Sequence, residues 1–473
     1  MAEMIIDGER VKGGGRDELP LYNPATGDVV GSVPVATPHD IERAAQASAI
    51  GFDLWRNKSA FERGMILRKG AAMMRQRTAD LAASLTREQG KTIAEATGEI
   101  IGSADLIEWL ADEGRRVYGR IVPARDRRSE QLVLHEPIGP VAAFSPWNYP
   151  VSLATRKIGH ALAAGCSIVI KPAEEAPSAV VDIAQILIDA GVPAAALQVV
   201  LGKPADISSQ LIQAPEIRKI SFTGSIPVGR ILGRLAGEAL KPVTFELGGH
   251  APVIVAEDAN IDRFLKGAVA AKFRNAGQIC ISPTRFFVHA SIYDEVVRRF
   301  ADLADALIVG DGMDPKTQMG PLAHARRPHT MEGLVENAIS TGARMVKGGP
   351  GEGKGFFWKP TVLSDVGQNA AAMREEPFGP LALFAPYDDL DDVIARANGT
   401  GHGLAAYVFA NNLGTVRRLQ DELRAGMVGI NTFNATLPEM PLVGVGDSGI
   451  GAAMGSEGLL EHMAIKSVFR VDA

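Results

Sequence analysis

Cysteine is rare in this sequence, and one of its two cysteines lies where a nucleophile could be held. Cys280 ends the segment 275–280, an Asn/Gly/Gln-containing turn that follows a helical stretch. Irregular backbone near a helix end can lower the pKa of a thiol, and the thiolate is the form that attacks. The alternative is a small apolar core residue, which describes most single cysteines. The segment makes Cys280 a candidate nucleophile and predicts a lowered thiol pKa.

Two other polar residues follow apolar strands at places suited to acyl chemistry. Glu246 closes the strand-like stretch 243–246, where a carboxylate could be a general base with a raised pKa. Asn148 lies in the Pro-flanked loop 146–150, where a rigid amide donor could stabilise an oxyanion. Asn side chains in turns also make ordinary local hydrogen bonds.

Strand-to-helix turns provide the candidate cofactor contacts. Gly224 and Ser225 lie between a strand and a helix, where close backbone approach and free N–H groups suit a phosphate. Only two glycines of the usual dinucleotide fingerprint could be matched here. Lys171 and Glu174 follow another strand, at the end where open α/β sheets bind ligands. Such a carboxylate could accept both ribose hydroxyls and would repel a 2′-phosphate.

The elements that must position these residues alternate between strand and helix. Apolar strands are expected at 141–144, 167–170, 197–200, 217–222 and 243–246, and helices at 151–164, 177–190, 204–213 and 226–239. Buried strands alternating with helices predict a parallel, doubly wound sheet. Strands near 252–255, 284–288, 380–385, 404–409 and 427–431 predict a second α/β domain. Residues 40–113 have helical periodicity, and 117–138 alternate as a strand pair would.

Composition excludes several classes of function. A length of 473 residues predicts two or three domains, and the net charge of −6 argues against nucleic acid and acidic membrane as partners. No apolar stretch reaches the roughly 18 residues of a membrane span, and no signal peptide is evident. We expect a cytoplasmic protein without disulfides. The nine histidines form no cluster with metal-ligand spacing, so no metal is predicted.

The order of the motifs resembles that of the aldehyde dehydrogenase superfamily. Six motifs carry the resemblance, which runs from about Leu21 to about Val471: Pro-Trp-Asn at 146–148, Lys-Pro-Ala-Glu at 171–174, Thr-Gly-Ser at 223–225, Glu-Leu-Gly-Gly at 246–249, Asn-x-Gly-Gln-x-Cys at 275–280 and Glu-Glu-Pro-Phe-Gly-Pro at 375–380. The branch that it resembles most is the succinate semialdehyde dehydrogenases. The resemblance implies two doubly wound (Rossmann-like) α/β domains plus a small β-strand oligomerisation arm.

The resemblance also implies a role for each matched residue. Cys280 would form a thiohemiacetal and then a thioester, Asn148 would donate to the oxyanion, and Glu246 would activate the hydrolytic water. The implied cofactor contacts are Trp147, Lys171, Glu174, Gly224, Ser225, Leu247, Glu376 and Phe378. Glu174 favours NAD on electrostatic grounds, with NADP possible because relatives with this residue accept both.

Two arginines narrow the range of candidate substrates. Arg156 and Arg274, the latter six residues before Cys280, match positions that hold the distal carboxylate of succinate semialdehyde in that branch. Two guanidiniums suit a carboxylate. The alternative makes Arg274 a helix-surface residue and Arg156 a salt-bridge partner. The branch has a serine in its C-terminal loop, where only Thr436 could substitute here. That difference leaves open an aromatic or longer aliphatic aldehyde.

The sequence leaves three functional classes open. The first is hydrolytic oxidation of a small-molecule semialdehyde acid. A CoA-acylating dehydrogenase would not need Glu246, and a non-catalytic protein would not need Cys280. Because Ile281 and Ser282 follow the nucleophile, no regulatory disulfide is expected beside it.

The expected organisation has three parts. An NAD-binding domain comprises 1–116 and 139–246, a catalytic domain comprises 247–445, and the oligomerisation arm comprises 117–138 and 446–473. A solitary strand pair is marginal in water and invites pairing with another subunit. We expect a homodimer or homotetramer.

Overall fold

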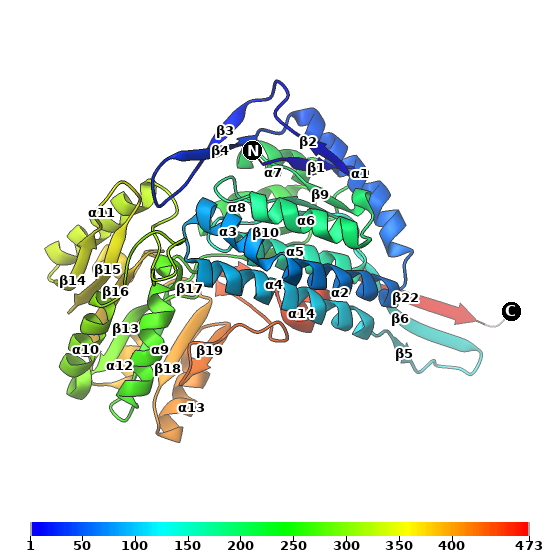
Figure 1. Cartoon of the computed structure of the whole chain (residues 1–473). Helices are drawn as coiled ribbons and strands as arrows, with labels where there is room; N and C mark the ends of the chain where they lie inside the picture. The colour runs from blue at the N-terminus through cyan, green and yellow to red at the C-terminus, as the bar shows by residue number, and fades with distance from the viewer. Residues whose placement is uncertain (1, 472–473) are drawn as a thin grey trace.

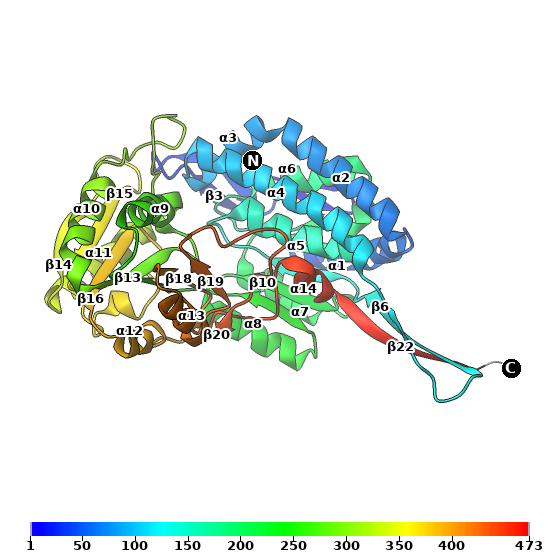
Figure 2. The ribbon, with the colours of Figure 1, turned by 90° about the horizontal axis from the view of Figure 1, so that it is seen from below.

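A computed structural model describes residues 2–471 of the chain. Two α/β lobes lie side by side, and a thin three-stranded arm projects from one of them (Figures 1 and 2). Each lobe has its own core of buried apolar side chains, one built mainly from residues before 248 and the other from residues after 250. The expected fold class is confirmed.

The first lobe is built on an eight-stranded sheet. Its order is β2 (Glu9–Val11), β1 (Met4–Ile6), β9 (Leu197–Val199), β8 (Ile168–Lys171), β7 (Val141–Phe144), β10 (Lys219–Thr223), β11 (Val243–Glu246) and β21 (Gly449–Ile450). The five central strands are parallel, and the connections reverse direction between β7 and β10. Ligands of open α/β sheets bind beyond the carboxyl ends of strands at such a switch point.

Strand register brings the predicted loops to that edge. Phe144 at the end of β7 is level with both Lys171 and Phe222, and Thr223 is level with Glu246. The loop 146–150, the turn 224–225 and Glu246 therefore leave the sheet at the same end. The crossover helices are α5 (Pro150–Ala164), α6 (Ser178–Ala190), α7 (Pro204–Gln213) and α8 (Ile226–Glu238), with a short 3-10 turn, η2 (Ala194–Ala196), before β9.

Four helices precede the arm. They are α1 (Pro38–Arg56), α2 (Ala60–Gln76), α3 (Thr78–Gln89) and α4 (Ile93–Glu113), followed by η1 (Gly114–Arg116). Helix α1 contacts the sheet, whereas the other three pack on the crossover helices α5 and α6. Three of them begin at reciprocal capping boxes, in which a Ser or Thr and an acid three residues later satisfy each other's backbone N–H groups. Helix α4 packs on α5, and this contact places α4 beside the loop of Asn148.

The second lobe is built on a seven-stranded sheet. Its order is β14 (Arg344–Pro350), β15 (Trp358–Ser364), β16 (Leu381–Tyr387), β13 (Pro283–His289), β12 (Ala251–Val255), β18 (Ala405–Phe409) and β19 (Met427–Ile430). All neighbours are parallel except β14 and β15. The associated helices are α9 (Ile261–Phe273), η3 (Arg274–Gly277), η4 (Ala290–Ile292), α10 (Tyr293–Asp305), α11 (Arg326–Ser340), η5 (Ala371–Met373), α12 (Leu390–Ala397) and α13 (Leu413–Glu422).

The sequence pattern did not predict the strands β1, β2, β14 and β15. These lie at or near sheet edges, where one face or one side of a strand is not buried and the apolar run is weaker. Two hairpin-like pairs complete the fold: β3 (Glu18–Tyr22) with β4 (Val29–Pro34), and β17 (His402–Gly403) with β20 (Val445–Gly446).

The arm consists of β5 (Arg120–Val122), β6 (Ser129–Pro137) and β22 (Met463–Val471). Most of its residues are exposed or half-buried, including Ile121, Ile465 and Phe469, each more than 70% exposed. The expected arm comprised 117–138 and 446–473, but in its second segment β21 pairs with β11 and α14 (Gly455–Leu460) packs on α5. The structure therefore places residues 449–460 against the first lobe. The division into functional domains stays a prediction.

Candidate active site

Two cavities meet at Cys280. One, of about 440 Å³, is lined by residues of α4, α5 and the C-terminal loop 436–442 together with Arg274. The other, of about 340 Å³, is lined by Trp147, Glu246, Leu247, Glu376, Phe378 and their neighbours. Cys280 and Asn148 line both cavities. We call them the substrate-side and the cofactor-side cavity.

The segment that holds Cys280 has a strained backbone. Asn275 and Ala276 both have left-handed φ values, 49° and 52°. Such values are uncommon for residues other than glycine, and they concentrate at functional sites. Gly277 also has positive φ, and a Cβ there would lie 2.2 Å from the carbonyl oxygen of Gly379. The turn predicted from the sequence is therefore specified by backbone geometry and close packing.

The predicted low pKa of Cys280 is wrong. Burial, with the charges of Glu246 and Glu376, raises the pKa of the thiol to about 12. These carboxylates outweigh the opposing charge of Arg156. The surroundings of Cys280 therefore favour its thiol form at neutral pH. Cys166, the second cysteine, is buried in the first lobe with its thiol directed at the His462 carbonyl.

Asn148 is held on its side-chain and its main-chain groups. Its Nδ2 donates to the Gln278 carbonyl at 3.0 Å, and its own carbonyl accepts from Asn275 Nδ2 at 2.8 Å. The Gln278 side chain closes this loop with bonds to the Asn275 carbonyl and the Ala323 N–H. One Nδ2 proton of Asn148 is used by Gln278, so the second can serve an oxyanion.

Glu246 is an ionised carboxylate with charged partners. Arg156 Nη1 and the Thr223 hydroxyl donate to its two oxygens, the latter at 2.7 Å, and Lys157 Nζ lies 3.8 Å away. Burial opposes ionisation, but the charges of Arg156 and Lys157 lower the pKa of Glu246. The predicted raised pKa is therefore wrong, because the sequence pattern did not show that two cations on α5 meet this strand end.

The aromatic residues of the cofactor-side cavity pack edge to face. Trp147 lies against Phe378 with ring centroids 5.4 Å apart, and against His324 at 5.1 Å. Glu376 accepts from the Gly249 N–H at 3.2 Å. Burial raises the pKa of Glu376 to about 8, against the charges of Arg327 and Lys272.

The turn before α8 is suited to an anion. Ser225 is the N-cap of α8, but its side chain makes no capping bond, so the first N–H groups of the helix are left for a ligand. Gly224 and Ser225 both line the cofactor-side cavity. The glycine also has a packing reason, because a Cβ would lie 2.3 Å from the ring of Phe222.

Lys171 and Glu174 form an ion pair outside the cofactor-side cavity. Glu174 lines a separate cavity of about 590 Å³ with Tyr22, Arg326 and Phe356. His324 lines both cavities, so they are neighbours. The other expected cofactor contacts line the cofactor-side cavity, whereas Lys171 and Glu174 lie next to that cavity and not in its wall.

The three predicted substrate residues all line the substrate-side cavity. Arg156 is 8% exposed, whereas Arg274 is exposed and makes no ion pair among residues 2–471. Thr436 lies in the loop between β19 and β20. Arg156 is therefore a salt-bridge partner, as the alternative interpretation expected, and it also lines the cavity.

Sequence reasoning missed several residues at the site. His324 and Arg327 line the cofactor-side cavity, and Arg327 donates to the carbonyls of Pro377 and Phe378. Lys91 and Glu99 lie beneath Asn148. The last two carried only a weak signal, charged residues at four-residue spacing that also include Glu95.

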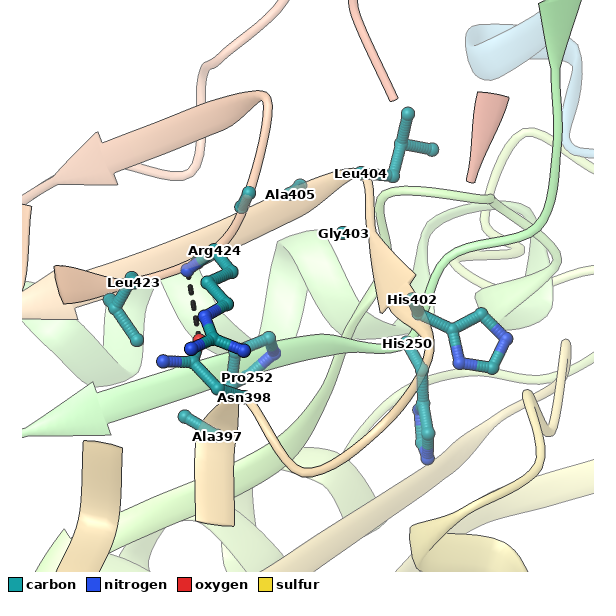
Figure 3. A pocket seen from close by; sticks show the side chains of 12 residues that line it. His250, Pro252, Ala397, Asn398, His402, Gly403, Leu404, Ala405, Leu423 and Arg424 are labelled. Atoms are coloured by element: carbon teal, nitrogen blue, oxygen red, sulfur yellow. Dashed lines mark hydrogen bonds between the residues drawn. The ribbon is translucent and has the colours of Figure 1, made fainter. Parts of the chain in front are cut away.

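A separate small pocket lies in the second lobe, away from Cys280. His250, His402 and Arg424 are among its lining residues, and the Arg424 N–H donates to Asn398 Oδ1 at 2.9 Å (Figure 3). It encloses about 10 Å³, too little for an organic substrate. Within residues 2–471, no three His, Cys, Asp or Glu side chains come together as a metal site would require. Each helix in this range falls short of the length and apolarity needed to span a bilayer.

Known proteins resemble the chain over nearly its whole length. Residues 11–468 match the profile of the aldehyde dehydrogenase family. The chain is 46% identical to a 4-(hydroxymethyl)benzenesulfonate dehydrogenase of Comamonas testosteroni, over 97% of this chain and 95% of that one. It is 40% identical to an Escherichia coli succinate-semialdehyde dehydrogenase named for NADP(+), over 98% and 96% of the two chains. The solved structure of a succinate-semialdehyde dehydrogenase from Burkholderia pseudomallei has a TM-score of 0.98 and 39% identity, covering 100% of this chain and 98% of that one.

Proposed function

The chain belongs to the aldehyde dehydrogenase family, and we propose that its substrate is an aldehyde with a distal acid group, such as succinate semialdehyde. The observation that carries this proposal is the pair of arginines on the wall of the substrate-side cavity. Arg274 makes no ion pair among residues 2–471, so its guanidinium is available to an incoming anion. A carboxylate between Arg156 and Arg274 would fix the far end of the substrate while Cys280 reacts with the near end.

Acylation begins at the Cys280 sulfur. As the thiol gives its proton to solvent water, the sulfur attacks the aldehyde carbon, and the carbonyl oxygen becomes an oxyanion. The free Nδ2 proton of Asn148 and the backbone N–H of Cys280 are the donors for that oxyanion. A nicotinamide held beside Cys280 by Glu376 and Phe378 would supply the hydride acceptor for this adduct. A thioester on Cys280 is the result.

Deacylation uses Glu246 as the base. Its lowered pKa keeps it ionised at neutral pH and ready to accept a proton from water. The water oxygen then attacks the thioester carbon, the carbon–sulfur bond breaks, and Cys280 is regenerated. To reach that water, the carboxylate must exchange bonds now made with Arg156 and Thr223.

We propose NAD as the cofactor. The uncapped start of α8 would hold the pyrophosphate, and Glu376 would hold a ribose. Glu174, which lines the neighbouring cavity and is paired with Lys171, would repel a 2′-phosphate that came near it. Comparing kcat/KM for NAD and NADP in Glu174→Gln and in wild type tests this. An improved NADP reaction in the variant supports the proposal, and an unchanged ratio contradicts it.

The experiment that tests the substrate class is a matched panel at saturating NAD. Succinate semialdehyde and butanal have the same chain length and differ in the distal carboxylate. We expect kcat/KM for the acid to exceed that for butanal by at least tenfold, and the difference to shrink in Arg274→Gln. Equal values for the two aldehydes would contradict the proposal. A requirement for CoA would show that a thiol replaces water as acyl acceptor.

A second candidate substrate is an aromatic aldehyde that carries an acid group. Gly98 and Gly102, one turn apart on α4, line the substrate-side cavity, and a Cβ at either would meet nothing within 4 Å. The 46% identical relative is named for an aromatic sulfonate. Gly102→Leu should reduce kcat/KM for 4-carboxybenzaldehyde more than for succinate semialdehyde. Gly333→Leu on α11, where a Cβ also meets nothing, is the matched control.

We propose that the arm mediates a homodimer or homotetramer. Its exposed Ile121, Ile465 and Phe469 are large apolar side chains on an otherwise thin projection. Phe469→Asp should lower the mass measured by light scattering, and an unchanged mass would contradict this role. The two free thiols, Cys166 and Cys280, support a reducing compartment, and we propose the cytoplasm.

A further inference from the structure

A buried ion pair lies beneath the loop of Asn148. The side chains of Lys91 and Glu99 have no exposed surface, and Lys91 Nζ donates to Glu99 Oε2. Removing two charges from water is costly, and apolar residues of similar volume often replace such pairs without loss of stability. The hydrogen bonds that the pair makes to its surroundings are therefore informative.

Lys91 holds the main chain of Asn148. Its Nζ donates to the Asn148 carbonyl at 3.0 Å, and the ammonium lies 3.8 Å from the ring centroid of Tyr149. Asn275 Nδ2 donates to the same carbonyl at 2.8 Å. The Asn148 carbonyl is thus held by hydrogen bonds from two separate segments, one containing Lys91 and the other Asn275.

Glu99 caps the helix that begins at this loop. Its Oε1 accepts from the N–H groups of Val151 and Ser152, both at 2.9 Å. Tyr149, the N-cap of α5, makes no side-chain capping bond, and Pro150 has no N–H. A carboxylate from α4 therefore satisfies donors at the N-terminus of α5, where a negative charge is also favoured by the helix dipole.

A third residue extends the same contact to the segment of Cys280. Glu95 Oε1 accepts from the Asn275 N–H at 2.7 Å. Lys91, Glu95 and Glu99 follow one another at intervals of four residues. The two acids therefore lie on one face of α4, and Lys91 lies just before the N-cap of that helix, Thr92. This face of α4 therefore contacts both the Asn148 loop and the Asn275 backbone.

We propose that Lys91 and Glu99 are positioning residues that set the direction of the Asn148 amide toward the oxyanion. The inference rests on the proposed function of Asn148. Both side chains bond to the Asn148 loop and the start of α5, and we expect their effect to pass through these segments. Because a misplacement of about 1 Å can reduce a rate by about 100-fold, loss of the Lys91 bond should slow acylation strongly.

Lys91→Met tests the proposal with the NADH burst of the full-length enzyme. We expect the burst rate to fall about tenfold or more, while NAD affinity changes less than twofold. Lys219→Met is the matched control, since Lys219 is a wholly buried lysine paired with Glu461 at 3.4 Å, at the opposite end of β10 from the site. Its burst rate should remain that of the wild type. An unchanged burst in Lys91→Met would overturn the proposal.

A double-mutant cycle separates positioning from general structure. In an Asn148→Ala background, Lys91→Met should have little further effect on the burst rate, because the group that it positions is gone. The same fold-change in both backgrounds would overturn the proposal. Glu99→Gln, which keeps shape and one acceptor, provides the same cycle if Lys91→Met does not fold. A wild type that forms no NADH with any aldehyde would overturn the proposed function itself, and the inference with it.

Discussion

Arg156 and Glu246, ninety residues apart in the chain, form a buried ion pair at the junction of the two cavities. Arg156 lines the substrate-side cavity and Glu246 the cofactor-side cavity. The Nε of Arg156 is buried and has no hydrogen-bond partner among residues 2–471. In the proposed mechanism, one guanidinium would contact both the substrate anion and the base Glu246. Anion binding and deacylation would then share a residue.

Arg156→Gln should shift the pH dependence of deacylation. The charge of Arg156 lowers the pKa of Glu246 against the effect of burial, so its removal should raise that pKa. The base must be unprotonated to accept a proton, and the acid limb of the deacylation rate should therefore move to higher pH. Single-turnover decay of the acyl-enzyme between pH 5 and 9 measures it.

Arg274→Gln is the control for that experiment. Arg274 lines the same cavity but makes no bond to Glu246, so this variant should raise KM for the semialdehyde and leave the acid limb in place. If both variants move the acid limb equally, the ion pair is not the cause of the shift.

Alkylation of Cys280 should accelerate with pH well past neutrality. With the pKa raised to about 12 by burial and by the charges of Glu246 and Glu376, the thiolate fraction grows about tenfold per pH unit. Iodoacetamide modification of the enzyme without cofactor, in a Cys166→Ala background, should increase through pH 10. Cys166→Ala itself should retain activity, whereas Cys280→Ala should lose it. A plateau near pH 8 would show that the free enzyme already holds a thiolate.

Glu246→Gln should separate the two half-reactions. Acylation does not need this base, so one equivalent of NADH per active site should appear, followed by turnover about 100-fold slower or more. Loss of a buried partner also leaves Arg156 and Lys157 uncompensated, and the midpoint of thermal unfolding should fall. Glu238→Gln at the exposed end of α8 is the control. Unchanged steady turnover would assign the base to another residue.

Glu376→Gln should change how stability depends on pH. The pKa of Glu376 is raised to about 8 by burial, above its value near 4.5 in an unfolded chain. Between these values the folded state binds more protons, so the contribution of this group to the free energy of unfolding falls as pH rises from about 4.5 to 8. In Glu376→Gln, the free energy of unfolding should therefore fall less over this pH range than in the wild type. Urea unfolding at pH 6 and pH 9 measures it, with the exposed neighbour in Glu375→Gln as control.

Local sequence was enough to predict much of the fold. Strands β7 and β11 and helix α7 have the predicted bounds, because continuous apolar runs between turn residues specify a buried strand, and a short amphipathic period specifies a helix. Edge strands such as β14 were missed, since half-exposed segments carry a weaker pattern. The candidate catalytic residues were predicted from the order of their motifs in the chain, and the structure brings Cys280, Asn148 and Glu246 to one cavity.

The sequence by itself determined which residues could react, the alternation that builds two parallel sheets, and the family to which their order belongs. Tertiary structure alone decided their electrostatics. Cys280 was expected to have a lowered pKa and has a raised one, and Glu246 the reverse, because each pKa depends on charges that come from distant segments. The buried contact of Lys91 with Asn148 was likewise invisible in the chain. Propensity and periodicity act over a few residues, whereas charge and burial act through space, and only the packed fold brings those charges together.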